Sequence, residues 1–390
     1  PDCAPARPPD PALDGLPLLA TANVLAFEPG RKIVLRRPLD LAEDLFVLHH
    51  TVGGHAVSKV DPNQHGLPVL PMTFSLEIMA EVATCLSPGL KAIGIENVRL
   101  FSWLAFDEDE LASFEATARL LPEPPADPKA TVQVAIEIHV LGGAANRTSG
   151  RSPTGQGVVL LAPDYPPAPP RSAFPLTDEH PCRIPVEVLY RNLFHGPLFQ
   201  GVVSSGRSGV EGLEGEVAVQ PRERLFRSQA SPRFLMDPVT LDIGMHPISA
   251  WHLEFEDQSG RVLLPIEVGK IEIFGDQLAP GTTLVSQSTF HGGTYRSFSH
   301  SVDLVRPDGR VWSRMRGLTF WRFYVPFAEV NFFGPKDEYF ISDVWDIGLA
   351  AAPHPACCIR LDTPPDQKQK TMRIVTSKVA LAPVEMAAYR

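Results

Sequence analysis

The sequence lacks the features that would place the chain in or across a membrane. It has no run of about 18 apolar residues, the length that a membrane-spanning helix requires. Residues 1–16 contain no apolar core of the kind found in a signal peptide. The net charge of -10 disfavours general binding to nucleic acids or to anionic membranes. We therefore expect neither a membrane nor a nucleic acid as a partner.

Cysteine is scarce, and its spacing carries no recognisable pattern. An odd number of cysteines without a CxxC pair predicts neither a disulfide framework nor a zinc site. A reducing, cytoplasmic setting is the simplest interpretation. The five cysteines are Cys3, Cys85, Cys182, Cys357 and Cys358.

Motifs of several other chemistries are absent from the sequence. It contains no GxSxG nucleophile elbow, no Walker motif and no GxGxxG loop, which disfavours covalent acyl transfer and a nucleotide cofactor. His49, His50, His55 and His65 lie near one another in the sequence, but they form no HExxH or HxH pattern. We therefore expect no cofactor and no metal.

Proline, by contrast, is abundant, and its clusters suggest where the chain divides. Of the 40 prolines, many lie in the stretches 1–11, 121–129 and 162–175. Proline cannot donate to a sheet ladder and stiffens extended chain, so such stretches are typical of loops and linkers. The sequence also begins with proline rather than methionine, and we expect a segment of a longer polypeptide. The predicted division is 1–17 linker, 18–165 first subdomain, 166–180 linker, 181–330 second subdomain, and 331–390 extension or linker to a further domain.

Each predicted subdomain contains strands, one apolar helix and further strands. Alternating apolar residues rich in β-branched side chains indicate the strands, and helical spacing after Pro71 and near Pro238 indicates the helices. The triplet 307–309, Pro-Asp-Gly, predicts a turn between the last two strands. These patterns predict an α+β fold with mostly antiparallel strands. The expected strands are 32–41, 45–50, 92–106, 113–121, 131–141, 201–209, 213–220, 262–274, 282–291, 298–306 and 310–323.

In the first subdomain, His50 is followed by Gly54 and later by Pro71 at the start of an apolar helix. This segment resembles the dehydratase domains of polyketide synthases and related fatty-acid synthases. Those domains carry a histidine in an HxxxGxxxxP segment that leads into an apolar helix. In residues 46–54, FVLHHTVGG, His50 matches the histidine and Gly54 follows at the expected spacing. Lys59 occupies the usual proline position, and Pro71 opens the helix after an insertion.

The second subdomain carries matching segments in the order that the family requires. Residues 195–201, HGPLFQG, resemble YGPxFQG, with His195 in place of tyrosine. Residues 237–246, DPVTLDIGMH, resemble HPxxLDxxxQ, so that Asp242 matches the catalytic acid. Asp237 replaces the usual histidine, and His246 stands where glutamine or histidine is usual. The supporting residues that this resemblance adds are Gly196, Pro197, Phe199 and Gln200.

The resemblance implies a double hotdog, in which two antiparallel sheets each wrap one helix around a pseudo-twofold axis. It also implies dehydration of 3-hydroxyacyl thioesters on an acyl carrier protein, next to other domains of a synthase. The residues around the first helix resemble iterative synthases for enediynes, polyunsaturated fatty acids or heterocyst glycolipids more than synthases of the modular type. Monomer and homodimer both stay open.

The chemistry of dehydration explains why these residue types are needed. A base must take the α-proton, and histidine suits this task because its ordinary pKa lies near neutrality. A carboxyl can assist the β-hydroxyl if an apolar site keeps it protonated. The resemblance gives these roles to His50 and Asp242. Gly53 and Gly54 are expected to let the backbone approach the thioester.

Several alternatives stay open at the level of sequence. His246 either bonds Asp242 from the next helical turn or is a structural polar residue. His195, Phe199 and Gln200 either line the substrate tunnel or only pack at the entry of a strand. The same acid and base would also suit a double-bond isomerase or a hotdog thioesterase, and a non-catalytic module that holds the chain is a further alternative.

Overall fold

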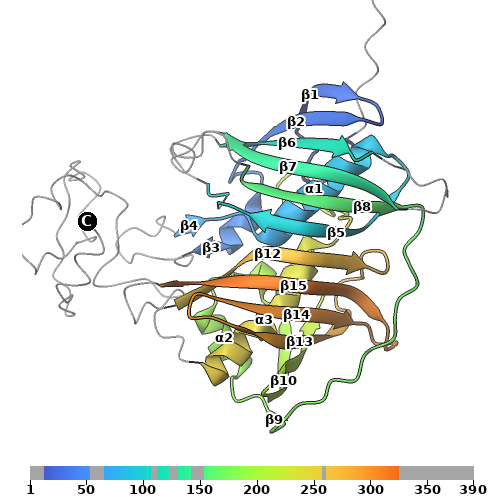
Figure 1. Ribbon diagram of the computed structural model, residues 1–390. Coiled ribbons are helices and arrows are strands. Elements are labelled where there is room, and N and C mark those ends of the chain that lie inside the picture. Colours follow the sequence, from blue (N-terminus) through green and yellow to red (C-terminus); the bar gives the residue numbers. More distant parts are fainter. Residues whose placement is uncertain are drawn as a thin grey trace, which may run out of the picture.

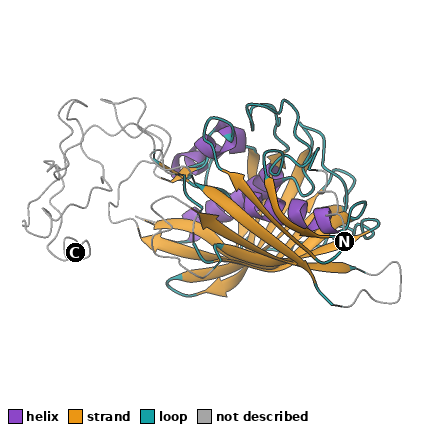
Figure 2. Cartoon of the chain, turned by 90° about the horizontal axis from the view of Figure 1, so that it is seen from above, coloured by secondary structure: helices purple, strands orange, loops and turns teal. Residues whose placement is uncertain are grey.

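The structure, a computed structural model, shows two helices lying against one long antiparallel sheet (Figure 1). The helices lie on one side of the curved layer of strands (Figure 2). The described residues are 13–52, 66–102, 104–106, 112–122, 131–141, 153–256 and 261–324.

The first half of the sheet surrounds the helix α1 (Met72–Leu86). A two-stranded ribbon, β3 (Thr51–Val52) with β4 (Leu67–Pro68), lies beside it. The other strands of this half are β1 (Asn23–Glu28), β2 (Lys32–Pro38), β5 (Lys91–Leu100), β6 (Ser113–Leu120), β7 (Val132–Leu141) and β8 (Gly155–Ala162).

The second half surrounds the helix α3 (Pro238–Phe255), with the short α2 (Val186–Asn192) and the 3-10 turn η3 (Pro197–Phe199) beside it. Its strands are β9 (His180–Pro181), β10 (Val202–Gly209), β11 (Gly212–Ala218), β12 (Arg261–Ile273), β13 (Thr283–Gly293), β14 (Ser297–Val305) and β15 (Val311–Tyr324).

The two halves join edge to edge in a single sheet of 13 strands, in the order β1-β2-β6-β7-β8-β5-β12-β15-β14-β13-β11-β10-β9. The junction is the antiparallel pair β5–β12, in which Ile95 faces Ile271. Gly94 permits this pairing, because a Cβ there would lie 2.2 Å from the Ile271 carbonyl oxygen. The predicted double hotdog is thereby confirmed.

Both long helices are buried almost all round, as expected for helices enclosed by a sheet and by each other. Fourteen of the 15 residues of α1 are buried, including Glu77 and Glu81. Gly157 of β8 lets the sheet approach Met79, whose sulfur would lie 3.2 Å from an added Cβ. The helices α1 and α3 also contact each other, so each half helps to enclose the helix of the other.

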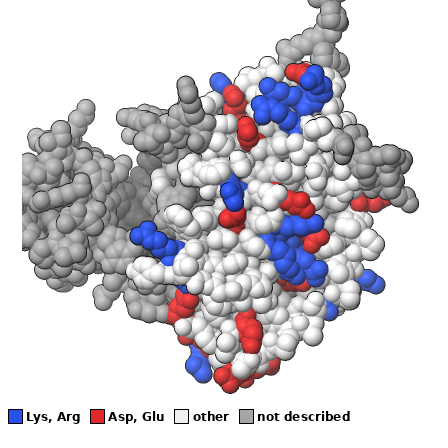
Figure 3. Space-filling view, viewed as in Figure 1, with Lys and Arg blue, Asp and Glu red and all other residues white. Residues whose placement is uncertain are grey.

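The outer face of the sheet carries charges in mixed groups, where blue and red side chains lie side by side (Figure 3). Lys270 of β12 lies 3.0 Å from Glu96 of β5, across the junction of the halves. Arg314 and Asp303 pair across β15 and β14 at 2.8 Å. An exposed pair such as Lys270–Glu96 contributes about 0.2–1 kcal/mol, so the apolar interior is the main source of stability.

One predicted strand is wrong. Residues 45–50 form the 3-10 helix η1 (Leu45–His49), with His50 at its end. The His50 amide donates to the Val47 carbonyl at 2.9 Å, which closes the turn. Phe46 stacks on Phe74 of α1 with ring centroids 3.9 Å apart. An apolar run of this length fits a strand or a helix, and tertiary packing decided between them.

The other predicted strands overlap strands in the structure, although β5 ends at Leu100 and not at residue 106. The elements that were not predicted are β1, β3, β4, β8, β9 and the helix α2. The segment between β8 and β9, at residues 163–179, contains no helix or strand, and it includes most of the predicted linker 166–180. The proposed division into subdomains stays a prediction, and residues 331–390 lie outside the described residues. None of the helices in the described part of the chain has the length and hydropathy of a membrane span.

Candidate active site

His50 is held between the two halves of the chain. Its carbonyl accepts from the Val69 amide at 3.1 Å, and its backbone forms an isolated antiparallel bridge with His195. The Gly196 amide donates to the His49 carbonyl at 2.7 Å. The backbone that carries His50 is therefore fixed from the first half by Val69 and from the second half by residues 195–196.

Gly196 is required for this close approach of the two halves. A Cβ at this position would lie 2.7 Å from the Nδ1 atom and 3.1 Å from the Cα atom of His49. Gln200 supports the same segment, because its side-chain amide donates to the His195 carbonyl at 2.9 Å. Pro197 opens the turn η3, and Phe199 at its end is fully buried. The HGPLFQG segment thus builds the wall that faces His50.

Asp242 lies in the second turn of α3, and the start of that helix is unusually well fixed. Asp237 is the N-cap, with φ 54°, and its carboxylate accepts from the Thr240 amide at 3.3 Å and from the Thr240 hydroxyl at 2.9 Å. Arg222, almost fully buried, donates to the same carboxylate at 2.5 Å. Pro238 occupies the first helical position, where its missing N–H costs nothing.

Glu77 of α1 fixes the segment that precedes α3, a role that no motif in the sequence indicated. Its two carboxylate oxygens accept from the backbone amides of Leu235 at 2.6 Å and Met236 at 2.8 Å. Glu77 is fully buried and belongs to the first half of the chain, whereas its partners belong to the second. These two hydrogen bonds from Leu235 and Met236 to Glu77, here called the clamp, therefore set the position of α3 and of Asp242 relative to the half that carries His50.

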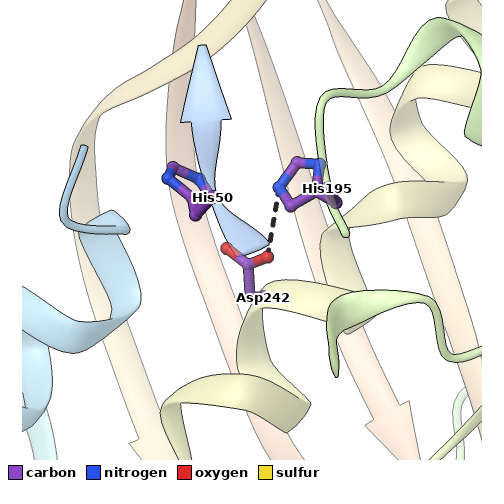
Figure 4. A group of neighbouring side chains, drawn as sticks. All are labelled: His50, His195 and Asp242. Atoms are coloured by element: carbon purple, nitrogen blue, oxygen red, sulfur yellow. Dashed lines mark ion pairs between the residues drawn. The ribbon is translucent and has the colours of Figure 1, made fainter. Parts of the chain in front are cut away.

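These supports bring His50, His195 and Asp242 together, with the carboxylate between the two imidazoles (Figure 4). The Nε2 atom of His195 lies 3.3 Å from the Oδ2 atom of Asp242, and the Nε2 atom of His246 lies at the same distance from that oxygen. The His50 and His195 rings are 5.0 Å apart between centroids. All four side chains are buried.

The hydrogen bond of His50 defines which ring nitrogen is free to react. Its Nδ1 atom lies 2.7 Å from the Val69 carbonyl oxygen, which can only accept, so Nδ1 carries the proton. The Nε2 atom then offers a lone pair. Burial, assisted by the nearby His195, lowers the pKa of His50 to about 4. His50 is therefore neutral near pH 7, as a base must be.

Asp242 is ionised, which corrects the expectation of a protonated carboxyl. Burial by itself raises the pKa of Asp242, but the His195 and His246 imidazoles outweigh burial and hold that pKa well below its usual range. Burial, with a contribution from His246, also lowers the pKa of His195. The surroundings of the carboxylate are thus two imidazoles rather than the apolar site that was expected.

A cavity of about 910 Å³, its open mouth included, leads to these residues. His50, His195, Asp242 and His246 form its polar end. Most of the remaining wall is apolar and comes from both halves, as a shared acyl tunnel would require. The apolar lining includes Val69, Leu70, Met72, Leu100, Leu104, Ile138, Phe194, Met245, Leu264 and Phe320.

The structure separates the predicted supporting residues into lining and packing positions. His195 and His246 line the cavity. Phe199 packs in the core with its ring centroid 6.0 Å from that of His50. Pro71 is the N-cap of α1, directly before the cavity-lining Met72.

The glycines predicted to approach the thioester cannot be placed. Gly53 and Gly54 lie outside the described residues, so their role stays a prediction. Tyr190 of α2 was missed by the sequence analysis: its hydroxyl lies 3.3 Å from the Nδ1 atom of His246 and accepts from the Val202 amide at 2.8 Å. No motif in the sequence indicated this contact.

The group that could hold a metal differs from the one that the sequence analysis considered. Among the described residues, His50, His195 and Asp242 each offer a ligand atom within 4.8 Å of the other two. Of the histidines that lie near one another in the sequence, His55 and His65 lie outside the described residues. Acid–base elimination itself requires only proton transfers.

The structure thus places His50 and Asp242 side by side within a double hotdog fold. Residues 174–324 match the family model described as polyketide synthase dehydratase N-terminal domain. This match covers less than half of the chain, and it agrees with the resemblance that the sequence motifs indicated. It covers Asp242 and His195, while the half that carries His50 is connected to it by the fold. No curated protein matches the chain.

Solved structures of dehydratase domains share the fold over most of the chain. The CurK dehydratase of the curacin polyketide synthase is 15% identical, with a TM-score of 0.54 over 79% of this chain and 97% of that one. The RzxB dehydratase domain from Pseudomonas fluorescens is 16% identical, with a TM-score of 0.52 over 74% and 94%. An isomerase-inactive variant of GphF DH1 is 15% identical, with a TM-score of 0.55 over 78% and 96%. Sequence identities of 15–16% show only that this chain and those domains share a fold.

Proposed function

We propose that this protein dehydrates a 3-hydroxyacyl thioester carried on the phosphopantetheine arm of an acyl carrier protein. The product is an α,β-unsaturated thioester of the trans-2-enoyl type, formed during polyketide or polyunsaturated fatty acid chain growth. The observation that carries this proposal is the meeting of His50 and Asp242, from different halves, at the polar end of one apolar cavity. Acyl carrier protein and neighbouring synthase domains are the proposed partners.

His50 is the proposed base. Its Nε2 atom takes the α-proton, while the Nδ1–H group stays bonded to the Val69 carbonyl and holds the ring in place. Negative charge then develops on the thioester carbonyl oxygen. Leu70 and Met72, which line the cavity, place the amino end of α1 at its wall. The partial positive charge of a helix amino terminus favours the anionic oxygen.

Asp242 is the proposed partner of the β-hydroxyl. As a carboxylate, Asp242 accepts a hydrogen bond from the β-hydroxyl. This hydrogen bond holds the Cβ–O bond in the orientation in which the hydroxyl can leave. His195 and His246 keep the carboxylate ionised and in place, each from 3.3 Å. The proton that His50 Nε2 takes from Cα is returned to the β-oxygen as the Cβ–O bond breaks, so the α-hydrogen and the hydroxyl leave together as water. No proton is gained or lost overall, and the reaction needs no cofactor.

Known dehydratases support this pairing of residue types. Two of the similar solved structures are inactive mutants of the CurK dehydratase, one with an aspartate replaced by asparagine and one with a histidine replaced by phenylalanine. A histidine and an aspartate are thus necessary in that protein. We propose that His50 and Asp242 have the corresponding roles in this chain.

The proposal is tested by mass spectrometry of a 3-hydroxyacyl chain loaded on an acyl carrier protein. We expect the wild-type protein to remove one water, and His50→Phe and Asp242→Asn to lower turnover by about 10²–10⁴-fold. His139→Phe and Asp164→Asn are matched controls, because these side chains lie partly exposed on or after strands of the sheet, away from the cavity lining. Free acid would instead indicate a thioesterase. An isomerase, the activity named for GphF DH1, would instead move the double bond of a 2-enoyl chain offered as substrate and would remove no water from the 3-hydroxyacyl chain.

The pH dependence gives a second test of the base. A base works only when it is unprotonated, so kcat/KM should fall as the pH drops through the pKa of His50 in the free enzyme. Because burial lowers that pKa to about 4, the acid limb should lie near pH 4 rather than near 6.5. An acid limb near 6.5 that disappears in His50→Phe would contradict the assigned environment of His50.

A further inference from the structure

We propose that His50, His195 and Asp242 form a Zn²⁺ site, and that occupancy of this site blocks the proposed dehydratase activity. The inference rests on the proposed function only for its inhibitory effect. The metal site itself follows from the geometry of three buried side chains contributed by both halves of the chain.

The donor set suits a borderline divalent metal. Two imidazoles and one carboxylate are ligands that zinc takes in catalytic sites, with a further position open to water or substrate. One ligand atom from each of His50, His195 and Asp242 lies within 4.8 Å of the other two. In this chain His195 supplies the second imidazole at a position where the resembling dehydratases carry tyrosine.

The distances are close to those of a bound metal. Zn–N and Zn–O bonds of about 2.0–2.1 Å give a tetrahedral ligand–ligand edge of about 3.3 Å. His195 Nε2 and Asp242 Oδ2 are already 3.3 Å apart. The remaining separations need to close by at most about 1.5 Å to reach such an edge, which small side-chain rotations can supply.

The surroundings of the site also fit a metal. The Nδ1–H of His50 donates to the Val69 carbonyl, the kind of outer contact that orients a metal-bound histidine. Within the described residues, Asp242 Oδ2 and His246 Nε2 are buried without a hydrogen bond of acceptable geometry, although they lie 3.3 Å apart. An unpaired buried carboxylate oxygen is costly, and a cation held by His50, His195 and Asp242 would satisfy Asp242 Oδ2.

The cavity gives a metal ion access to the three ligands, and no positively charged side chain among its described lining residues competes for Asp242. None of its described lining residues is a lysine or an arginine, so Asp242 is the one charged side chain among them. A metal at this point would use the lone pair of His50 Nε2, which the proposed reaction needs for the α-proton. Zinc and substrate should therefore exclude each other.

Calorimetric titration of the metal-free full chain with Zn²⁺ tests the site directly. We expect one zinc ion per chain, and a visible d–d absorption when Co²⁺ replaces it. His195→Phe should lower the zinc affinity by more than about tenfold, since even outer-contact changes cost about 10–100-fold. His139→Ala should bind as the wild type does. The double variant His55→Ala/His65→Ala should also bind unchanged.

Three results would overturn the site: no stoichiometric binding, unchanged affinity in His195→Phe, or loss of binding in the double variant. Turnover then tests inhibition separately. We expect zinc to raise the apparent KM and a chelator to reverse the effect, whereas full turnover at saturating zinc would refute inhibition. A chain that binds zinc but removes no water would refute the proposed function and leave the metal site standing.

Discussion

The clamp between Glu77 and the segment before α3 makes a specific prediction for catalysis. Burial raises the pKa of Glu77 to about 8, so the comparison is made above that pH. There, Glu77→Gln replaces two carboxylate oxygens, which accept from Leu235 at 2.6 Å and Met236 at 2.8 Å, with one amide oxygen. One buried backbone N–H then faces an NH₂ group, which costs about 1–3 kcal/mol. The segment leads directly into Asp237 and α3, so relief of this clash should displace Asp242 from His50.

Two measurements separate the effects of this change. Urea unfolding should show a loss of about 1–3 kcal/mol in the free energy of unfolding. Steady-state turnover should show a kcat lower by about 10–100-fold, because a displacement of about 1 Å in a reacting group costs that much. The KM should change little, since Glu77 does not line the cavity.

Glu81 provides a matched control one helical turn away. It is equally buried on α1, but its carboxylate accepts from the amide of Leu18, in the segment before β1. Glu81→Gln should therefore leave the kcat of the folded protein unchanged. The reasoning is refuted if Glu77→Gln keeps wild-type kcat and stability, or if Glu81→Gln lowers kcat to the same degree.

Two further predictions concern Gly196 and a buried histidine pair. Gly196→Ala should lower kcat and should lower the free energy of unfolding by about 1–3 kcal/mol, because the new Cβ would lie 2.7 Å from His49. Gly275→Ala is the control, because the nearest atom to its new Cβ would lie at 3.8 Å. We expect this control to behave as the wild type does in the same urea and turnover assays. Burial lowers the pKa of His252 to about 4 and that of His300, bonded to it at 3.1 Å, well below the usual range. The unfolded chain therefore binds more protons, so stability should be full above pH 6.5 and fall toward pH 4, by roughly 3 kcal/mol for His252 alone. Urea unfolding as a function of pH measures this loss, and a His252→Gln variant with an equally steep acid limb would contradict it.

The sequence predicted much of the fold because strand and helix periodicities are local. Alternation in residues 113–121 and 131–141 predicted β6 and β7, and Pro71 and Pro238 marked the starts of α1 and α3. Residues 45–50 were wrongly predicted as a strand, because their apolar run is too short to carry a period and the packing of Phe46 selected a 3-10 turn.

The sequence predicted the residues of the candidate site, but it did not predict the charge of the Asp242 carboxyl. The motifs around His50, His195 and Asp242 singled out side chains that the structure brings to one cavity. The sequence could not show that two imidazoles approach the same carboxylate oxygen, because His195 and Asp242 are 47 positions apart along the chain. The expected protonated carboxyl was therefore replaced by an ionised one.

By itself, then, the sequence determined the alternating strands, the two apolar helices and the identity of the proposed base and its carboxylate partner. These depend on residue types and short spacings, which are fixed by the covalent chain. Only the tertiary structure decided the burial of Glu77 against Leu235, the tautomer of His50 and the charge of Asp242. Each of these depends on a contact between segments distant in sequence, and such a contact exists only after both halves have folded against each other.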